Sequence, residues 1–177
     1  MKKLTFTLPY PLLLPNRRGL PANRAAAAAA IKKERVMMAM EIAALLAGIR
    51  PVEPIQYARV WVFRHSTGQE PDRDNFNAAC KGLLDVLQPS TAKRSYGLGV
   101  IENDKPGRCD LRIHHVHAKH STQQMTRVII TEIDAAEIDA VRAAVAKEAE
   151  QAASLIGVHG APLGLDKDAS AKALAAA

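Results

Sequence analysis

The sequence has few cysteines, few aromatic residues and no long apolar run. Its two cysteines, Cys80 and Cys109, are too few for the disulfide framework of a small secreted domain and fit a reducing compartment. No apolar stretch reaches the roughly 18 residues that a membrane-spanning helix requires. Prolines interrupt the apolar residues of the opening segment MKKLTFTLPYPLLLPNRR, so we expect no signal peptide. These absences predict a cytoplasmic protein without a membrane partner, and the lack of a glycine-rich phosphate loop predicts no nucleotide cofactor.

Positive charge is concentrated in the larger, N-terminal part of the chain. The formal net charge is +6. Up to Ile133 there are 20 Lys+Arg against 11 Asp+Glu, a balance of +9, and from Asp134 onward there are 4 against 7, a balance of −3. A basic body with an acidic tail predicts a polyanionic partner for the body. The alternative is that the positive balance serves only to keep the protein in solution.

Residue periodicity predicts an α+β fold with a mixed or antiparallel sheet and two principal helices. The predicted strands are 3–8, 54–64, 98–101, 109–117 and 126–133, the last two as a hairpin. The predicted helices are 24–48, which Asn23 caps, 74–87, and an alanine-rich helix that begins near residue 134. The change in composition predicts a domain over 1–133 and a C-terminal helical extension over 134–177.

The stretch EPDRDNFNAACKGLLDVL, at 70–87, gathers carboxylates around a lysine. Residues two apart in an extended segment point the same way, so we expect Asp72 and Asp74 to lie side by side before the helix. Asp74, Lys81 and Asp85 fall within about 40° of one line along that helix. The spacing therefore predicts two carboxylates and an ammonium on one helix face.

Clustered carboxylates in a basic protein favour a metal site for phosphodiester hydrolysis. Such groups raise one another's pKa unless a cation joins them, and their oxygen atoms suit Mg²⁺ or Mn²⁺. The metal offsets charge on the phosphate and activates a water, while a nearby lysine stabilises the transition state. A further carboxylate is available in the turn Glu102-Asn103-Asp104.

A structural role for the same residues is the alternative. Asp72 and Asp74 would then cap the positive end of the helix. Lys81 and Asp85 would form an ordinary i, i+4 ion pair, which contributes little at a solvated surface.

Several segments resemble the RusA family of Holliday junction resolvases. They are PDRDN at 71–75, KGLLD at 81–85, the acidic turn END at 102–104, and the opening TFTLPYPLLLPNR at 5–17. The resemblance covers roughly residues 4–133. It implies a Mg²⁺-dependent endonuclease, for which Mn²⁺ can substitute, that acts as a homodimer on branched DNA such as a four-way junction. The implied compartment is the nucleoid or the cytoplasm of a phage-infected cell.

The family's functional residues can be matched to this chain by motif. The resemblance implies that the metal ligands, which also count as catalytic residues, are Asp72, Asp74 and Asp104. It implies that Lys81 stabilises the transition state. The residues expected to support these groups without binding the metal directly are Asn75, Asp85 and Asn103. Asn103 stands where the family carries one carboxylate of an acidic pair.

Basic residues in loops or at a helix start are the positions that we assign to DNA backbone contact. They are Arg17, Arg18, Arg24, Lys93 and Arg94. A solvated basic loop is the alternative for each of them.

The histidine-rich stretch HHVHAKH, at 114–120, raises the hypothesis of a zinc site. No cysteine pattern accompanies it, so we favour histidines that are solvated or that contact phosphate. Cys80 is expected to be a buried structural thiol.

Three functions follow from these observations. The leading hypothesis is an endodeoxyribonuclease that resolves Holliday junctions or related branched DNA by paired nicks. The second is a non-catalytic, branched-DNA-binding relative of the same fold, which Asn103 supports. The third is a metal-binding structural or phage assembly protein that binds no DNA.

Overall fold

The computed structural model describes residues 2–17, 19 and 23–159. Contacts divide the chain into two units, Met1–Arg142 and Ala143–Ala177. Composition predicted a boundary between residues 133 and 134, which is earlier in the chain than this division. The predicted boundary falls between the last strand and the last helix that the structure describes. Within the described ranges, no helix combines the length and apolar character needed to cross a bilayer.

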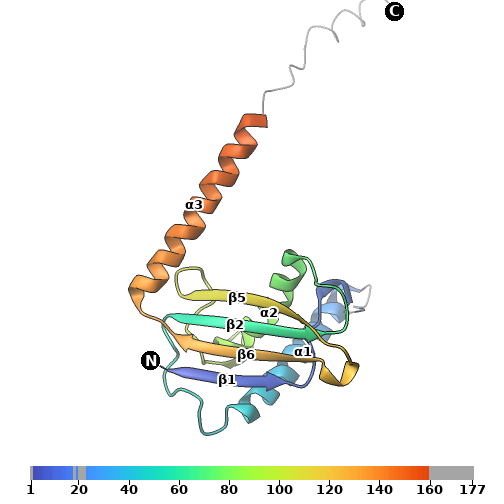
Figure 1. The fold of residues 1–177 in the computed structure, drawn as a ribbon. Coiled ribbons are helices and arrows are strands. Elements are labelled where there is room, and N and C mark those ends of the chain that lie inside the picture. The colour runs from blue at the N-terminus through green and yellow to red at the C-terminus, as the bar shows by residue number, and fades with distance from the viewer. Residues whose placement is uncertain (1, 18, 20–22, 160–177) are drawn as a thin grey trace, which may run out of the picture. The chain divides into compact units, whose positions relative to one another are not determined.

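The chain contains both strands and helices, and the predicted α+β fold class is confirmed (Figure 1). The strands are β1 (Lys3–Leu8), β2 (Ala58–Ser66), β3 (Pro89–Thr91), β4 (Arg94–Leu98), β5 (Cys109–His117) and β6 (Met125–Glu132). The helices are α1 (Arg24–Leu45), α2 (Arg73–Leu87) and α3 (Ala135–His159), with 3-10 turns at Pro15–Arg17 and Ser121–Gln123. Asn23 caps α1 as predicted, because its side chain accepts hydrogen bonds from the backbone amides of residues 25 and 26.

The main sheet has the strand order β1-β6-β2-β5. β6 runs antiparallel to both of its neighbours, and β5 runs parallel to β2. The predicted hairpin between the last two strands is therefore wrong. Val128 and Ile130 make β6 suited to the sheet interior, where both are fully buried. The charged and histidine-rich β5 takes the edge, where polar side chains remain in contact with water.

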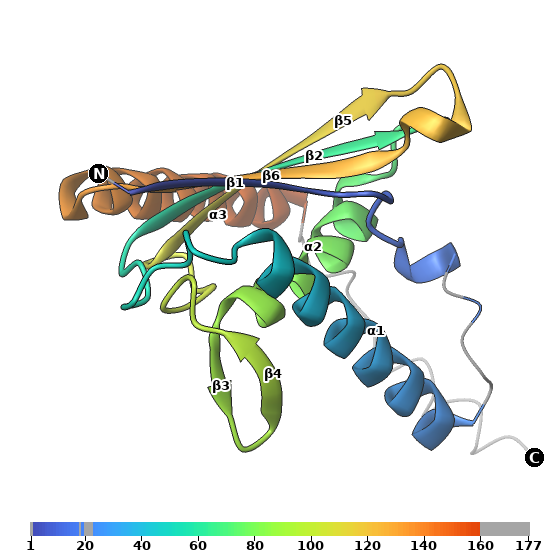
Figure 2. The same ribbon diagram turned by 90° about the horizontal axis from the view of Figure 1, so that it is seen from below.

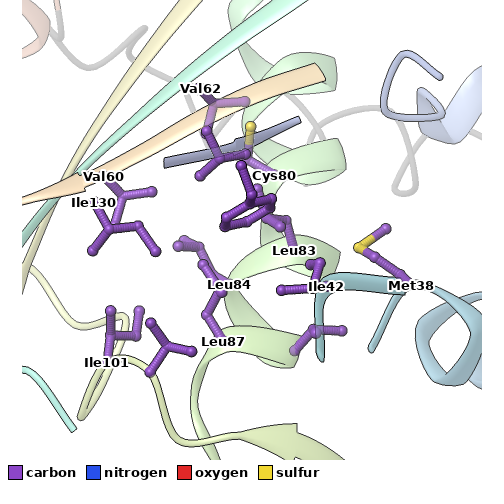
Figure 3. Close-up of a cluster of buried hydrophobic side chains, with 14 of the residues drawn as sticks. Met38, Ile42, Val60, Val62, Cys80, Leu83, Leu84, Leu87, Ile101 and Ile130 are labelled. Atoms are coloured by element: carbon purple, nitrogen blue, oxygen red, sulfur yellow. The ribbon is translucent and has the colours of Figure 1, made fainter. Parts of the chain in front are cut away.

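Helices α1 and α2 lie on one face of this sheet, as Figure 2 shows. The side chains of β2 alternate, and Val60 and Val62 point into the layer between sheet and helices, where they are fully buried. Figure 3 shows them near Ile130 of β6, Leu83 of α2 and Ile42 of α1. Burial of one side of α2 in this core directs its polar residues outward, Asp74 and Lys81 among them.

A small hairpin, β3–β4, occupies a segment in which the sequence predicted no strand before residue 98. The strand predicted over 98–101 is wrong for most of its length. Gly99 has φ 66°, a left-handed conformation that ends β4 at Leu98. Ile101 then forms an isolated parallel bridge with Ile55. Ile55 precedes β2, whose observed start at Ala58 is later than the predicted start at residue 54.

Candidate functional site

The start of α2 holds Asp72 in a defined conformation. Asp72 is the N-cap of the helix, and its Oδ1 accepts a hydrogen bond from the backbone amide of Asn75 at 2.8 Å. The side-chain amide of Asn75 donates to the other carboxylate oxygen. These bonds, the backbone one first, hold the pKa of the exposed Asp72 carboxyl below its ordinary value. The capping alternative is therefore what the structure shows at Asp72, and Asn75 supports that carboxylate.

Asp74 and Lys81 are exposed on α2. The helix begins at Arg73, so the prediction that Asp74 lies beside Asp72 in an extended segment before the helix is wrong. Asp85 takes part in a separate ion-pair cluster. Asp85 pairs with Arg35 of α1 at 3.0 Å and with Arg94 of β4 at 3.4 Å. The carboxylate of Asp85 therefore ties α1, α2 and β4 together. Arg94, which we assigned to DNA contact, has its guanidinium in this cluster.

Asp104 lies near the start of β5. Ile101, shortly before it, donates its backbone N–H to the carbonyl oxygen of Leu87, the last residue of α2, at 3.1 Å. After Asp104 the chain enters β5 at Cys109. Burial first, and the nearby charge of Asp104 second, raise the pKa of the Cys109 thiol to about 12. These contacts place Asp104 close to the C-terminal end of α2.

The three predicted metal ligands are thus not brought together within one chain. Asp72 and Asp74 stand at the N-terminal end of α2, and a helix of 15 residues spans about 22 Å. Asp104 lies toward the other end, in a turn where the Asn103 side chain accepts a hydrogen bond from the backbone amide of Lys105 at 3.0 Å. Over the part of the chain that the structure describes, no three His, Cys, Asp or Glu side chains are grouped to hold a metal ion.

A polar groove lies between the beginning of α2 and the edge strand β5. Its volume is about 370 Å³, and it is lined by Glu70, Pro71, Arg73, Phe76 and Asn77 on one side and Leu111, Arg112, Ile113 and His114 on the other. Arg73 stands between Asp72 and Asp74 in the chain, so the groove begins next to the residues that carry the exposed carboxylates, although neither carboxylate lines it. Sequence reasoning missed Arg73 and Arg112 as site residues. The charged alternation along β5 could have indicated Arg112.

The other residues assigned to DNA contact lie on separate parts of the surface. Arg24 is exposed at the first turn of α1, and Lys93 is exposed in the turn between β3 and β4. The backbone of Arg17 ends the first 3-10 turn. Arg18 lies outside the described residues.

The histidines of β5 point to different sides of the sheet. His115 Nε2 lies 3.0 Å from the Ser66 hydroxyl oxygen, and His114 stacks on Trp61 and Phe63. This alternation is that of an ordinary strand. It does not gather these two rings around one ion.

Cys80 is buried in the core, as predicted for a structural thiol. Burial is the main cause that raises its pKa to about 12, so the reactive thiolate is scarce at neutral pH.

Comparison with known proteins adds no assignment to these observations. The sequence matches no protein-family model and no curated protein. The site consists of two exposed carboxylates at the positive end of a helix beside a groove with basic side chains. Such an arrangement suits a phosphate-containing ligand bridged to carboxylates by a cation.

Proposed function

We propose that this chain is a Mg²⁺-dependent endonuclease that nicks four-way junctions or related branched DNA, as its resemblance to the RusA family implies. The observation that carries the proposal is the exposed pair Asp72 and Asp74 beside the groove that contains Arg73 and Arg112. Carboxylates for a metal and cations for phosphates then lie next to each other. The compartment proposed with this function is the nucleoid or the cytoplasm of a phage-infected cell.

The carboxylates at the start of α2 fit Mg²⁺, which is commonly held by one or two carboxylates and completed by water and substrate phosphate. The two oxygens of Asp72 each accept a hydrogen bond from Asn75 and retain capacity for another interaction. The low pKa of Asp72 keeps it ionised, as a ligand must be. When bound, the metal supplies charge neutralisation at the phosphate and a more acidic water.

The surrounding residues have separate roles in this proposal. Arg73 and Arg112 hold the phosphate backbone along the groove. Lys81 lies on the same helix face as Asp74, about 10 Å further along the axis. From there its ammonium is directed at negative charge that develops on the DNA strand, in the role that the resemblance implies.

A homodimer is part of the proposal because Asp104 lies in a turn near the C-terminal end of α2, whereas Asp72 and Asp74 of the same chain lie at its N-terminal end. A second copy can bring its Asp104 to that pair, and twofold symmetry then creates two equal sites. Two equal sites match the paired cuts that a symmetric junction requires. A monomer would leave the three carboxylates divided between the two ends of α2.

The test is a nicking assay with a labelled synthetic four-way junction and a linear duplex of matched sequence, in Mg²⁺. We expect paired nicks in the junction alone, and their loss in Asp74→Asn. Asp139→Asn, an exposed substitution of the same kind on α3, serves as the control and should nick like wild type. A thermal shift on addition of Mg²⁺, present in wild type and reduced in Asp74→Asn, reports metal binding separately from activity.

The second candidate is a relative that binds branched DNA without cutting it. Asn103 and the separation of Asp104 from the other carboxylates favour it. It is distinguished by tight junction binding without nicks in either Mg²⁺ or Mn²⁺. In that case Asn103→Asp is the first substitution with which to seek restored cleavage.

A further inference from the structure

The face of the main sheet opposite α1 and α2, here called the outer face, carries aromatic side chains. Figure 1 views the sheet from this side, with the two helices behind it. Alternation along β2 directs Val60 and Val62 into the core and Trp61 and Phe63 onto the outer face. Both rings are half-buried although they point away from the core. A solvated sheet face normally carries polar residues at such positions.

Three rings on the outer face form one set, Trp61, Phe63 and His114, which we call the ring set. The centroid of His114 lies 5.4 Å from that of Trp61 and 5.2 Å from that of Phe63. Trp61 and Phe63 are 6.4 Å apart. The planes of the three rings differ by 16° or less, so the set offers one common orientation to another flat ring.

Basic side chains surround the ring set. By strand register, the basic residues on the outer face are Lys3, Arg59, Arg112 and Arg127. Arg112 stands opposite Trp61 on β5, and Arg127 stands opposite Phe63 on β6. One acidic residue of these strands shares the face, the buried Asp110, which pairs with Arg59 and Arg112. Glu137 of α3 also pairs with Arg59, at 3.6 Å. With four basic residues to two acidic, the outer face is positive.

We propose that the outer face binds single-stranded nucleic acid, with unpaired bases stacking on the ring set and phosphates contacting Arg127 and its basic neighbours. Aromatic rings within a positive surface are the combination that single-strand-binding proteins use. Double-stranded DNA offers phosphates but keeps its bases stacked and paired, so it cannot use the rings. A second copy of this chain is a poor occupant, because its outer face would bring like charge against like charge.

The outer face is continuous with the groove beside α2, because His114 belongs to the ring set and also lines that groove. An unpaired strand that leaves the groove across the edge strand β5 would therefore reach the ring set directly. Binding on the outer face does not require cleavage. The inference consequently stands apart from the nuclease proposal and is tested without a cutting assay.

The chain contains a single tryptophan, Trp61, so its fluorescence reports on the proposed surface alone. The titrant is oligo(dT) of about 15 nucleotides, within the range of known single-strand sites. Excitation at the red edge of tryptophan absorption avoids absorption by the bases. Oligo(U), an abasic phosphate chain and a blunt duplex, all of the same length, are titrated in parallel. We expect saturable quenching by oligo(dT), and at least tenfold weaker quenching by the abasic chain and the duplex.

Oligo(U) distinguishes the two sources of unpaired bases. Equal affinity for oligo(dT) and oligo(U) supports a site for any single strand, and tighter binding of oligo(dT) supports a DNA site. No quenching by either one, or equal quenching by the abasic chain, overturns the proposal. Equal quenching by the duplex overturns it as well, because the surface would then bind phosphates only.

Substitutions then locate the surface. Phe63→Ala should weaken oligo(dT) binding by about tenfold, a typical loss for one stacked base. Arg127→Ala, at an exposed residue, should weaken binding severalfold and make it less sensitive to salt. Lys33→Ala removes the same charge from an exposed residue of α1 and should bind like wild type. Thermal unfolding of each variant checks its fold, and if Phe63→Ala does not fold, Arg127→Ala carries the test. Equal weakening by Lys33→Ala and Arg127→Ala would overturn the location.

Discussion

Replacement of Asp85 by asparagine tests whether this carboxylate is a structural group or part of the catalytic site. Asp85→Asn keeps the shape of the side chain and removes its charge. In the folded protein the charge is shared by Arg35 and Arg94, at 3.0 and 3.4 Å. Arg35 also donates a hydrogen bond to the Tyr96 hydroxyl at 3.0 Å, so the cluster holds α1, α2 and β4 together. Without Asp85 the two guanidinium groups would repel each other.

The expected loss of stability follows from how far the cluster is removed from water. The side chains of Asp85, Arg35 and Arg94 are 14%, 27% and 21% exposed. Loss of one partner from a fully buried pair costs about 3–5 kcal/mol, whereas an exposed pair is worth less than about 1 kcal/mol. Between these limits, we expect Asp85→Asn to lower the free energy of unfolding by about 2 kcal/mol.

Urea unfolding measures this loss directly. With a slope of about 1–3 kcal/mol per molar urea, the midpoint should fall by roughly 1 M. Asp139→Asn, in an exposed pair with Arg142, should leave the midpoint unchanged. A loss below about 0.5 kcal/mol would show that the cluster is not a structural tie. Reduced junction nicking by Asp85→Asn at a temperature where it remains folded would instead show a role in the reaction.

Three further outcomes are expected. Asp74→Asn and Asp104→Asn should each abolish nicking. A refolded mixture of the two variants should recover nicks, because one site of the mixed dimer then has all its carboxylates. An inactive mixture would place each site within a single chain. Gly97→Ala should lower the urea midpoint, because a Cβ there would lie 2.5 Å from the carbonyl oxygen of Gln88 and 2.6 Å from the carbonyl group of Pro89. An unchanged midpoint would contradict this close approach. The pKa of Cys80 and of Cys109 is raised by burial to about 12. Stability should therefore be fully retained below the unfolded thiol pKa near 8.5 and fall by about 1.4 kcal/mol per pH unit per thiol above it; a flat urea midpoint from pH 8 to 10.5 would refute this.

Local sequence signals predicted the three helices and the strands of the main sheet, but not the β3–β4 hairpin. The capping side chain of Asn23 and the alanine-rich run after it define α1, and alternation defines β1. The start of α2 was predictable because aspartate is a preferred capping residue. Each of these features depends on residues a few positions apart in the chain.

Pairings between distant segments were not predictable in the same way. The chain has no local signal that places β6 between β1 and β2 rather than beside β5, because that order depends on which strand buries more apolar surface. The partners of Asp85 come from α1 and β4, so its spacing from Lys81 indicated the wrong pair. The position of Asp104 was not predictable either. The END turn at 102–104 resembles a metal-ligand motif, but where Asp104 lies depends on the length of α2 and on the β3–β4 hairpin that follows it.

The place of β6 in the sheet has a consequence for how the protein is made. Among the strands that the structure describes, β6 is the last to be synthesised, yet it is the one that joins β1 to β2. Until it has been synthesised, the first strand has no neighbour in the sheet and β2 has an open edge. The nascent chain therefore carries exposed strand edges until β6 has been synthesised, a state that favours aggregation or capture by chaperones. Closure of the sheet therefore depends on the pairing of β1 with β6, which spans the largest sequence separation in this sheet.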